Sequence, residues 1–147
     1  MSEVYKICLT KKSGEDMLEV NSVKVIAKKG IINDRYFDEN NDKDIQITLI
    51  EKENIDYYNQ ISNTNIPYIN FRRNIITSGI KLNDLINHEI LIGATRIKAH
   101  RLCDPCKYLQ DILMQKNLVK NFINRGGLRC EVLTDGKISI NDEITVI

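Results

Sequence analysis

The sequence predicts a small, mainly β protein, either a barrel or a sandwich with a few helices. Most of its periodic segments alternate polar and apolar residues with the two-residue repeat of half-buried strands. These segments are short, rich in isoleucine and valine, and separated by polar or glycine-containing turns. The length of 147 residues suits one core, so we expect a single domain over residues 1–147.

The strand prediction is clearest at the end of the chain. Asp135-Gly136 suits a tight hairpin turn whose central residues need positive φ, and apolar runs flank it on both sides. We therefore expect the last two strands to pair with each other. The predicted strands are residues 4–9, 22–27, 45–50, 90–100, 128–133 and 137–147.

Helical periodicity appears in two segments. In residues 51–61, a repeat of three to four residues places Ile55, Tyr58 and Ile61 on one face. Residues 106–124 show the same repeat, and glycines at positions 126 and 127 are available to end this helix. Its apolar face is predicted to carry Leu109, Ile112, Leu113 and Phe122.

Composition excludes several classes of partner. The net charge is only +1, so no overall field favours nucleic acid or an anionic membrane, and any anion site must be local. The N-terminal residues lack the basic and apolar regions of a signal peptide, and no apolar run is long enough to cross a bilayer. We therefore expect a cytoplasmic protein whose four cysteines are reduced thiols.

The sharpest local motif is Cys103-Asp104-Pro105-Cys106. Asp104 is a favourable N-cap and Pro105 a favourable first helical residue, which would put Cys106 in the first turn of a helix. Unpaired backbone N–H groups there favour the thiolate, a nucleophile and a metal ligand. An inert thiol, a redox dithiol and half of a zinc site are the alternatives. Zinc is not expected, because a closed site needs four ligands.

A second candidate motif is the segment from Arg72 to Thr77. If it is extended, Arg72 and Asn74 project to one face while Arg73 and Thr77 project to the other, so only one arginine serves an interior site. A guanidinium binds phosphate or carboxylate through two parallel hydrogen bonds, and an asparagine amide adds a donor and an acceptor. The alternative is a pair of solvated arginines at a sheet edge.

Weaker signals lie elsewhere. Asp34, Arg35 and Tyr36 follow a turn and form either an ion pair or the edge of a site. His100 is interpreted as structural or solvated. Cys130 alternates with apolar neighbours and is interpreted as a buried structural thiol.

In their order along the chain, these motifs resemble the MOSC family, the module found at the C-terminus of molybdenum-cofactor sulfurases. The resemblance spans nearly the whole sequence. Asn33 and Asn141 replace two glycines of the family pattern, and asparagine is the next most tolerant residue at positive φ. The matching segments are Gly30 to Arg35, Gln46 to Ile50, Arg72-Arg73-Asn74, Leu82 to Leu85, Ile92-Gly93, Pro105 to Leu109, Gly126-Gly127 and Asn141-Asp142.

The resemblance implies a fold and a set of site residues. The fold would be a small, closed, mostly antiparallel β-barrel with peripheral helices. Cys106 would carry sulfur as a persulfide or coordinate molybdenum, and Cys103 could serve as a resolving thiol. Arg72 and Asn74 would hold the phosphate or pterin of the cofactor. The mouth of the same site would be lined by Asp34, Arg35 and Tyr36.

The function that the resemblance implies is binding of the molybdenum cofactor, or of its tungsten form, during cofactor sulfuration or delivery. A cysteine desulfurase or a molybdoenzyme would be the protein partner. One alternative is a small molybdoenzyme that reduces N-hydroxylated compounds. Another is a dithiol or interaction module without a cofactor. The sequence leaves open whether the protein is an enzyme, either a sulfurtransferase or a molybdenum-dependent reductase.

Overall fold

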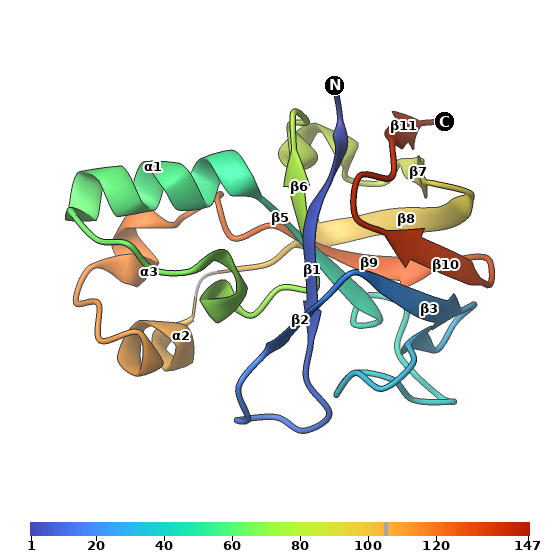
Figure 1. Ribbon diagram of the computed structural model, residues 1–147, viewed down its shortest axis with the longest axis horizontal. Coiled ribbons are helices and arrows are strands. Elements are labelled where there is room, and N and C mark those ends of the chain that lie inside the picture. Colours follow the sequence, from blue (N-terminus) through green and yellow to red (C-terminus); the bar gives the residue numbers. More distant parts are fainter. Residues whose placement is uncertain (105) are drawn as a thin grey trace.

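The computed structural model describes residues 1–104 and 106–147, and it confirms a mainly β fold with few helices. The strands occupy one end of the molecule and the helices the other (Figure 1). An eight-stranded sheet has the order β11-β7-β8-β9-β5-β6-β1-β2. Its strands are β1 (Glu3–Leu9), β2 (Leu18–Val20), β5 (Ile47–Glu51), β6 (Ile75–Ser78), β7 (Glu89–Ile92), β8 (Thr95–Leu102), β9 (Leu128–Val132) and β11 (Ile144–Val146).

The expected closed barrel is wrong, because the large sheet is curled but open. Its two edges are β2 and β11, each only three residues long. Near the start of β1, one isolated bridge joins Glu3 to Glu143, and the N–H of Ile144 donates to the carbonyl of Ser2 at 2.9 Å. These contacts hold the β11 edge of the sheet near β1, although β11 and β1 do not pair as neighbouring strands. Pairing is antiparallel except between β5 and β6, which run parallel.

The predicted hairpin at Asp135-Gly136 is also wrong. A second, three-stranded sheet has the order β10-β3-β4, with β10 (Gly136–Ser139), β3 (Ser22–Ile26) and β4 (Gly30–Ile31). β10 pairs with β3 in this sheet, whereas β9 pairs with β5 and β8 in the large one. The Asp135 carboxylate accepts a hydrogen bond from the N–H of Ala27 at 2.7 Å, which fixes the point where the chain changes sheets.

Two segments predicted as single strands are each broken into two. Residues 90–100 form the β7–β8 hairpin around Gly93, and residues 137–147 divide into β10 and β11 at Asn141. Both turn residues have positive φ, 60° and 69°. The two turns pack together, because the N–H of Gly93 donates to the carbonyl of Glu143 at 2.9 Å.

The helices cover one end of the curled sheet. α1 (Lys52–Ser62) is confirmed, although Ile61 is exposed and only Ile55 and Tyr58 are buried. The expected helix over 106–124 is instead two short helices, α2 (Lys107–Ile112) and α3 (Leu118–Asn121), separated by a turn in which Met114 has φ of 55°. Two 3₁₀ turns, Tyr68–Phe71 and Leu82–Leu85, complete the elements. In the described part of the chain, no helix has the length and apolar character needed to cross a bilayer.

The buried apolar side chains form two clusters. The larger one fills the space between the two sheets and is rich in isoleucine and valine. The smaller one lies beneath the helices and centres on three aromatic rings, Tyr58, Phe71 and Phe122. The Phe71 and Phe122 rings are stacked with centroids 5.3 Å apart, and Tyr58 meets Phe122 edge to face at 5.5 Å. This aromatic cluster anchors the helices that border the candidate site.

A cluster of charged side chains joins β9 to β8 and to the β3–β4 turn, and it is expected to make the stability of the fold depend on pH. The Glu131 side chain, only 10% exposed, lies 2.8 Å from Nε2 of His100 and 3.2 Å from Nζ of Lys28. Burial raises the pKa of Glu131, but the hydrogen bonds from His100 and Lys28 outweigh it and hold the pKa below its usual range. A carboxyl whose folded pKa is depressed adds stability above its unfolded pKa and loses it as the pH falls through the folded value.

Glu131→Gln is therefore expected to lower the free energy of unfolding by about 1 to 2 kcal/mol at neutral pH. The difference from wild type should shrink as the pH falls below roughly 4.3, the ordinary glutamate pKa, because Glu131 then becomes neutral in both states. Urea unfolding across this range measures it. Glu39→Gln is the matched control, because the Glu39 side chain is 81% exposed and its ion pair is weak. A Glu131→Gln deficit that does not change with pH would contradict the assignment.

Candidate functional site

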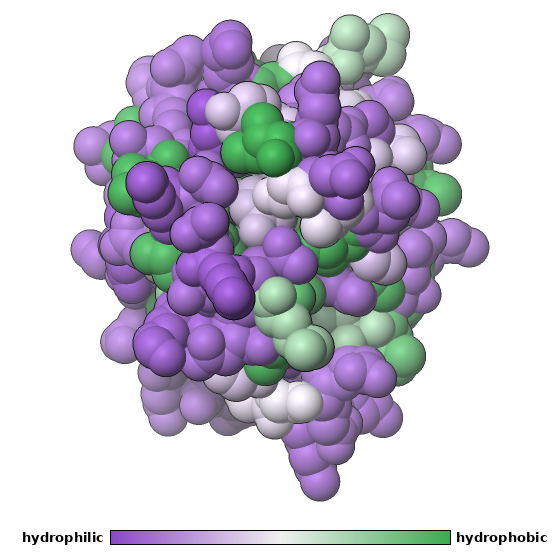
Figure 2. Space-filling model, turned by 90° about the vertical axis from the view of Figure 1, so that its left-hand side faces the viewer, coloured by the Kyte–Doolittle hydropathy of each residue, from purple (hydrophilic) through white to green (hydrophobic). Residues whose placement is uncertain are grey.

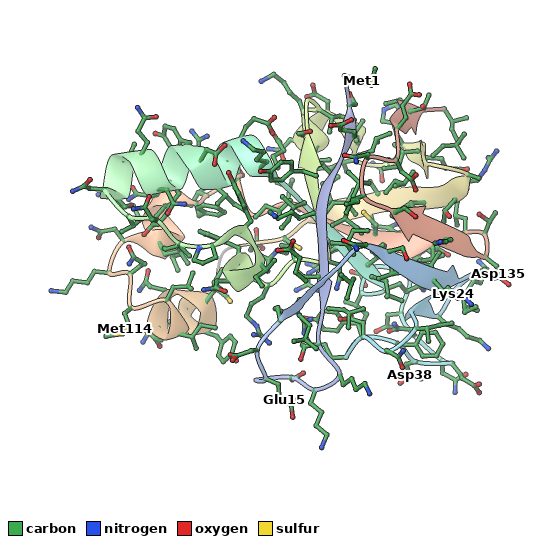
Figure 3. The ribbon with its side chains drawn as sticks, in the orientation of Figure 1. Met1, Glu15, Lys24, Asp38, Met114 and Asp135 are labelled. Carbon is green, nitrogen blue, oxygen red and sulfur yellow. The ribbon has the colours of Figure 1, made fainter. Side chains whose placement is uncertain are left out.

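A pocket of about 180 Å³ lies where the β1–β2 loop, the start of β6 and the start of α2 meet. Four arginines line it, Arg35, Arg72, Arg73 and Arg129, together with the Cys106 thiol. A second pocket of about 310 Å³ shares Gly14, Arg72 and Tyr108 with the first, so the two adjoin. Figure 3 labels Glu15 in the β1–β2 loop and Met114 just after α2, and both this loop and α2 contribute lining residues to the two pockets.

Cys106 stands at the N-terminus of α2, two positions earlier in the helix than expected. It is the N-cap itself, with extended backbone angles of −122° and 154°, and the helix begins at Lys107. Its Sγ accepts a hydrogen bond from the N–H of Leu109 at 3.4 Å. Asp104 is therefore not the N-cap, and Pro105, expected as the first helical residue, lies outside the described residues. The side chain is exposed, so its sulfur is accessible from solvent.

The other three cysteines are free thiols in buried positions. Burial raises the pKa of Cys8 to about 12, and its Sγ donates to the carbonyl of Arg73 at 2.9 Å. Cys130 is completely buried, and desolvation raises its pKa. Cys103 is 2% exposed, and its N–H donates to the carbonyl of Gly127 at 2.7 Å. Within the described chain, Cys106 is thus the one exposed thiol.

Arg72 does not lie on a strand as predicted. It ends the 3₁₀ turn Tyr68–Phe71 in a left-handed conformation with φ of 64°, and β6 begins only at Ile75. The two-residue alternation of side chains does not apply before that point, so Arg72 and Arg73 both reach the pocket. Nη1 of Arg72 donates to the carbonyl of Glu15 at 2.8 Å, which ties the β1–β2 loop to the pocket wall.

Asn74 is completely buried and does not line the pocket. Its Oδ1 accepts hydrogen bonds from the N–H and the hydroxyl of Thr48, each at 3.1 Å, and its Nδ2 donates to the carbonyl of Cys8 at 3.3 Å. These bonds connect the entrance of β6 to β5 and β1. The amide is therefore engaged within the fold, and Asn74 does not share a face with Arg72.

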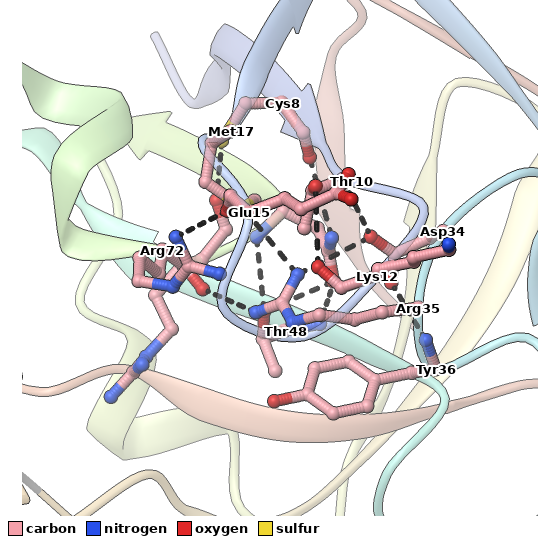
Figure 4. A network of polar contacts seen from close by, with 12 residues as sticks. Cys8, Thr10, Lys12, Glu15, Met17, Asp34, Arg35, Tyr36, Thr48 and Arg72 are labelled. Carbon is pink, nitrogen blue, oxygen red and sulfur yellow. Dashed lines mark hydrogen bonds and ion pairs between the residues drawn. The ribbon is translucent and has the colours of Figure 1, made fainter. Parts of the chain in front are cut away.

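Asp34, Arg35 and Tyr36 form a network behind the pocket wall (Figure 4). The Arg35 side chain is only 6% exposed, and its Nη2 donates to the carbonyl of Arg72 at 3.1 Å. Asp34 lies 3.4 Å from Nη1 of Arg35 and also accepts from the N–H of Thr10. The guanidinium carbon lies 4.3 Å from the centre of the Tyr36 ring. Arg35 and Tyr36 line the pocket, whereas Asp34 is buried beneath them.

Two pocket arginines were not selected from the sequence. The predicted strand places Arg73 on the face opposite Arg72. This is wrong, because β6 begins only at Ile75 and both arginines line the pocket. Arg129 lies on β9 between Thr48 of β5 and Arg101 of β8. The sequence contains a signal for Arg129, because the apolar residues Leu128 and Cys130 flank it. Both are buried, so the Arg129 side chain points to the opposite face of the sheet. Its Nε is buried and has no hydrogen-bond partner among the described residues.

The pocket is cationic, and its chemistry favours anions. Among its described lining residues, Asp104 is the single acid against four guanidinium groups. No group of three or more His, Cys, Asp or Glu residues in the described chain is arranged to hold a metal ion. The guanidinium of Arg129 makes no hydrogen bond within the described structure, so an anionic group placed against its Nη atoms would give them a partner. The site therefore combines anion recognition with one accessible sulfur.

The fold and site together define a class, a mainly β protein with an arginine-lined pocket and one exposed thiol. The MOSC domain family matches residues 34–145, and the chain belongs to this family. The matched range includes every arginine of the pocket and Cys106. No curated protein matches the chain by sequence.

Solved structures of other proteins share the fold, and three of them illustrate the likeness. The YUAD protein from Bacillus subtilis has a TM-score of 0.86 at 16% identity, covering 99% of this chain and 96% of that one. YiiM from Geobacillus stearothermophilus has a TM-score of 0.82 at 17% identity, covering 100% of this chain and 75% of that one. YiiM from Escherichia coli has a TM-score of 0.69 at 17% identity, covering 99% and 68%. At these identities the likeness concerns the fold alone.

Proposed function

We propose that this MOSC protein binds the molybdenum cofactor and takes part in its sulfuration or delivery through Cys106. The observation that carries the proposal is one pocket that contains an exposed thiol and four guanidinium groups. The cofactor carries a phosphate, and arginine binds phosphate through paired hydrogen bonds. A thiolate is a soft ligand for the metal and also a group that can bear an additional sulfur atom.

The residues present fit such a group. Arg129 lines the pocket, and its guanidinium makes no hydrogen bond within the described structure, so its Nη groups remain for an anionic oxygen. Nε of Arg73 donates to the carbonyl of Gly126 at 2.9 Å. This hydrogen bond fixes the orientation of a guanidinium that lines the pocket. Arg35 is fixed by Asp34 and Tyr36 and contributes a permanent positive charge to the wall. When bound, the cofactor supplies a redox-active metal.

The residues of this chain have separate roles in the proposal. Arg72, Arg73 and Arg129 would bind the phosphate, and Arg35 would add to the attraction. Asp34 would position Arg35 without touching the ligand. Asn74 would support the strands below the site. Cys106, held by the N–H of Leu109, would face the metal or carry sulfur to it. The same site accepts a tungsten form, since the contacts involve the organic part and a thiolate.

Loading the protein with cofactor released from a source protein, followed by native mass spectrometry, tests the proposal. We expect wild type to retain molybdopterin and Arg129→Ala to retain it roughly 10- to 100-fold more weakly, as expected for loss of a charge-assisted hydrogen bond. Arg96→Ala is the matched control, because Arg96 lies on β8 in an exposed ion pair with Glu89. If neither wild type nor Cys106→Ala retains any molybdopterin, the proposal is wrong.

Mixing the loaded protein with a candidate partner tests the delivery role. A molybdoenzyme lacking its cofactor should gain activity, and a cysteine desulfurase should place sulfur on Cys106. Cys106→Ala should abolish the second reaction while the folded protein keeps its unfolding midpoint.

A further inference from the structure

We infer that Cys106 also accepts sulfur from a small thio-oxyanion, of which thiosulfate is the simplest, as a donor besides a cysteine desulfurase, and that the arginine pocket binds the oxyanion half. This inference rests on the proposed role of Cys106 as a sulfur carrier, and it requires no bound cofactor. It assigns a sulfurtransferase activity and a class of sulfur donor to the site. The charge, the unpartnered donors and the size of the pocket support it.

The charge of the pocket suits a dianion. Its described lining residues include four guanidinium groups and one carboxylate, that of Asp104. Arg35 is in addition paired with the buried Asp34, which reduces its net contribution. Thiosulfate carries two negative charges, and the attacking thiolate carries a third. A pocket without this excess of positive charge would keep the two reactants apart by repulsion.

Several N–H groups of the pocket arginines have no hydrogen-bond partner in the described structure and can donate to the oxyanion. Nη1 of Arg72 donates to the carbonyl of Glu15, and Nε of Arg73 donates to the carbonyl of Gly126. Within the described structure, Nη2 of each of these residues and the Nη atoms of Arg129, which also lines the pocket, have no hydrogen-bond partner. Guanidinium groups bind planar pairs of oxygens, and a sulfonate-like group presents such pairs.

The size of the pocket accommodates a small oxyanion next to the sulfur. Its volume of about 180 Å³ corresponds to roughly six water molecules at the volume per molecule of the liquid. The adjoining pocket of about 310 Å³ opens beside Tyr108 and provides an approach for a sulfur acceptor. Figure 2 shows that the helical end of the molecule is mostly hydrophilic, with apolar side chains in small separate groups.

The chemical step balances without an additional oxidant or reductant. The Cys106 thiolate attacks the outer sulfur of thiosulfate, and a new S–S bond forms on Sγ. The S–S bond of thiosulfate breaks, and its electron pair leaves with sulfite. One thiolate and one dianion give one persulfide anion and one sulfite dianion. An acceptor such as cyanide then takes the outer sulfur as thiocyanate and regenerates the thiolate.

The arginines act on this step through the leaving group. Negative charge accumulates on the sulfite oxygens as the S–S bond breaks, so donors fixed against those oxygens bind the transition state more tightly than the ground state. The N–H of Leu109, 3.4 Å from Sγ, is placed to stabilise negative charge on the cysteine. These residues hold and orient both reactants in one pocket.

The test uses the reduced full chain with thiosulfate, without any cofactor. Persulfide on Cys106 is followed by intact mass and peptide mapping, sulfite by its release, and turnover by thiocyanate formation with cyanide. We expect wild type to gain the mass of one sulfur atom on Cys106 and to release an equal amount of sulfite. Cys106→Ser should do neither. Arg129→Ala should slow the reaction roughly 100- to 1,000-fold, the range for loss of one oxyanion donor.

Controls separate recognition from folding and from the cofactor proposal. Arg96→Ala should react like wild type, and Arg129→Lys, which keeps the charge but lacks the fork, should fall between wild type and alanine. Inorganic sulfate should inhibit wild type competitively, a measurement that needs no variant. Absence of persulfide with thiosulfate, or insensitivity to sulfate, overturns the inference. Retention of molybdopterin by the same preparation would leave the proposed function standing, whereas persulfide formation without molybdopterin retention would reject only cofactor binding.

Discussion

Iodoacetamide applied to the folded protein is expected to alkylate Cys106 and to leave the other three cysteines unmodified. Cys106 is exposed, whereas Cys8 and Cys130 are completely buried and Cys103 is 2% exposed. A buried thiol reacts only when the structure opens locally. If this opening costs a few kcal/mol, Cys106 is alkylated about 100-fold faster, or more, than the buried cysteines.

Ionisation adds to this selectivity. Thiolates, and not thiols, are the reactive species. Burial raises the pKa values of Cys8 and Cys130, so few of these thiols are ionised at neutral pH even when they become accessible. Peptide mapping after timed alkylation measures each site, and the same experiment in urea should label all four cysteines. Comparable labelling of Cys103 and Cys106 in the native protein would contradict the burial of Cys103 and would support a dithiol role.

The largest loss of stability is expected from Gly127→Ala. Gly127 has φ of 97°, and a Cβ atom there would lie 1.8 Å from the carbonyl oxygen of Leu49 and 3.1 Å from Cα of Ile50. Both contacts are with the backbone of β5, which is fixed by pairing with β6 and β9. The clash therefore forces strands apart in the centre of the sheet. We expect a loss of more than about 4 kcal/mol in the free energy of unfolding.

Gly14→Ala is the matched control for this prediction. Gly14 has φ of 86°, but a Cβ atom there would have no neighbour within 4 Å. Its substitution by alanine should cost only the backbone strain of a left-handed residue, about 1 to 2 kcal/mol. Urea unfolding of the two variants separates steric overlap from backbone strain. Equal losses would show that the approach of Gly127 to β5 is relaxed at little cost.

The periodicity of the sequence was sufficient for individual elements. Residues 4–9 and 45–50 correspond to β1 and β5, and residues 51–61 correspond to α1. These predictions succeed because the pattern of burial repeats along the chain at the spacing of the element itself. The division of 106–124 into two helices was missed because Met114 adopts a left-handed turn that apolar spacing does not encode.

Strand pairing was less accessible from the sequence. Asp135-Gly136 has the composition of a hairpin turn, but the strands on either side of it belong to different sheets. The Asp135 side chain is instead used by Ala27, more than a hundred residues earlier in the chain. Local turn chemistry cannot report a partner at such a separation. The prediction of a closed barrel is wrong for a related reason. Closure depends on how far the sheet curls, and local sequence patterns do not report this either.

By itself, the sequence determined the mainly β class, the first helix, and the place of Cys106 at a helix start, each of which follows from neighbouring residues. Only the tertiary structure decided that Arg35, Arg72, Arg73 and Arg129 meet around that thiol. They come from the segment before β5, the residues between a 3₁₀ turn and β6, and the start of β9. Their meeting depends on strand order and on the left-handed backbone at Arg72, and contacts between segments so far apart leave no periodic trace in the chain.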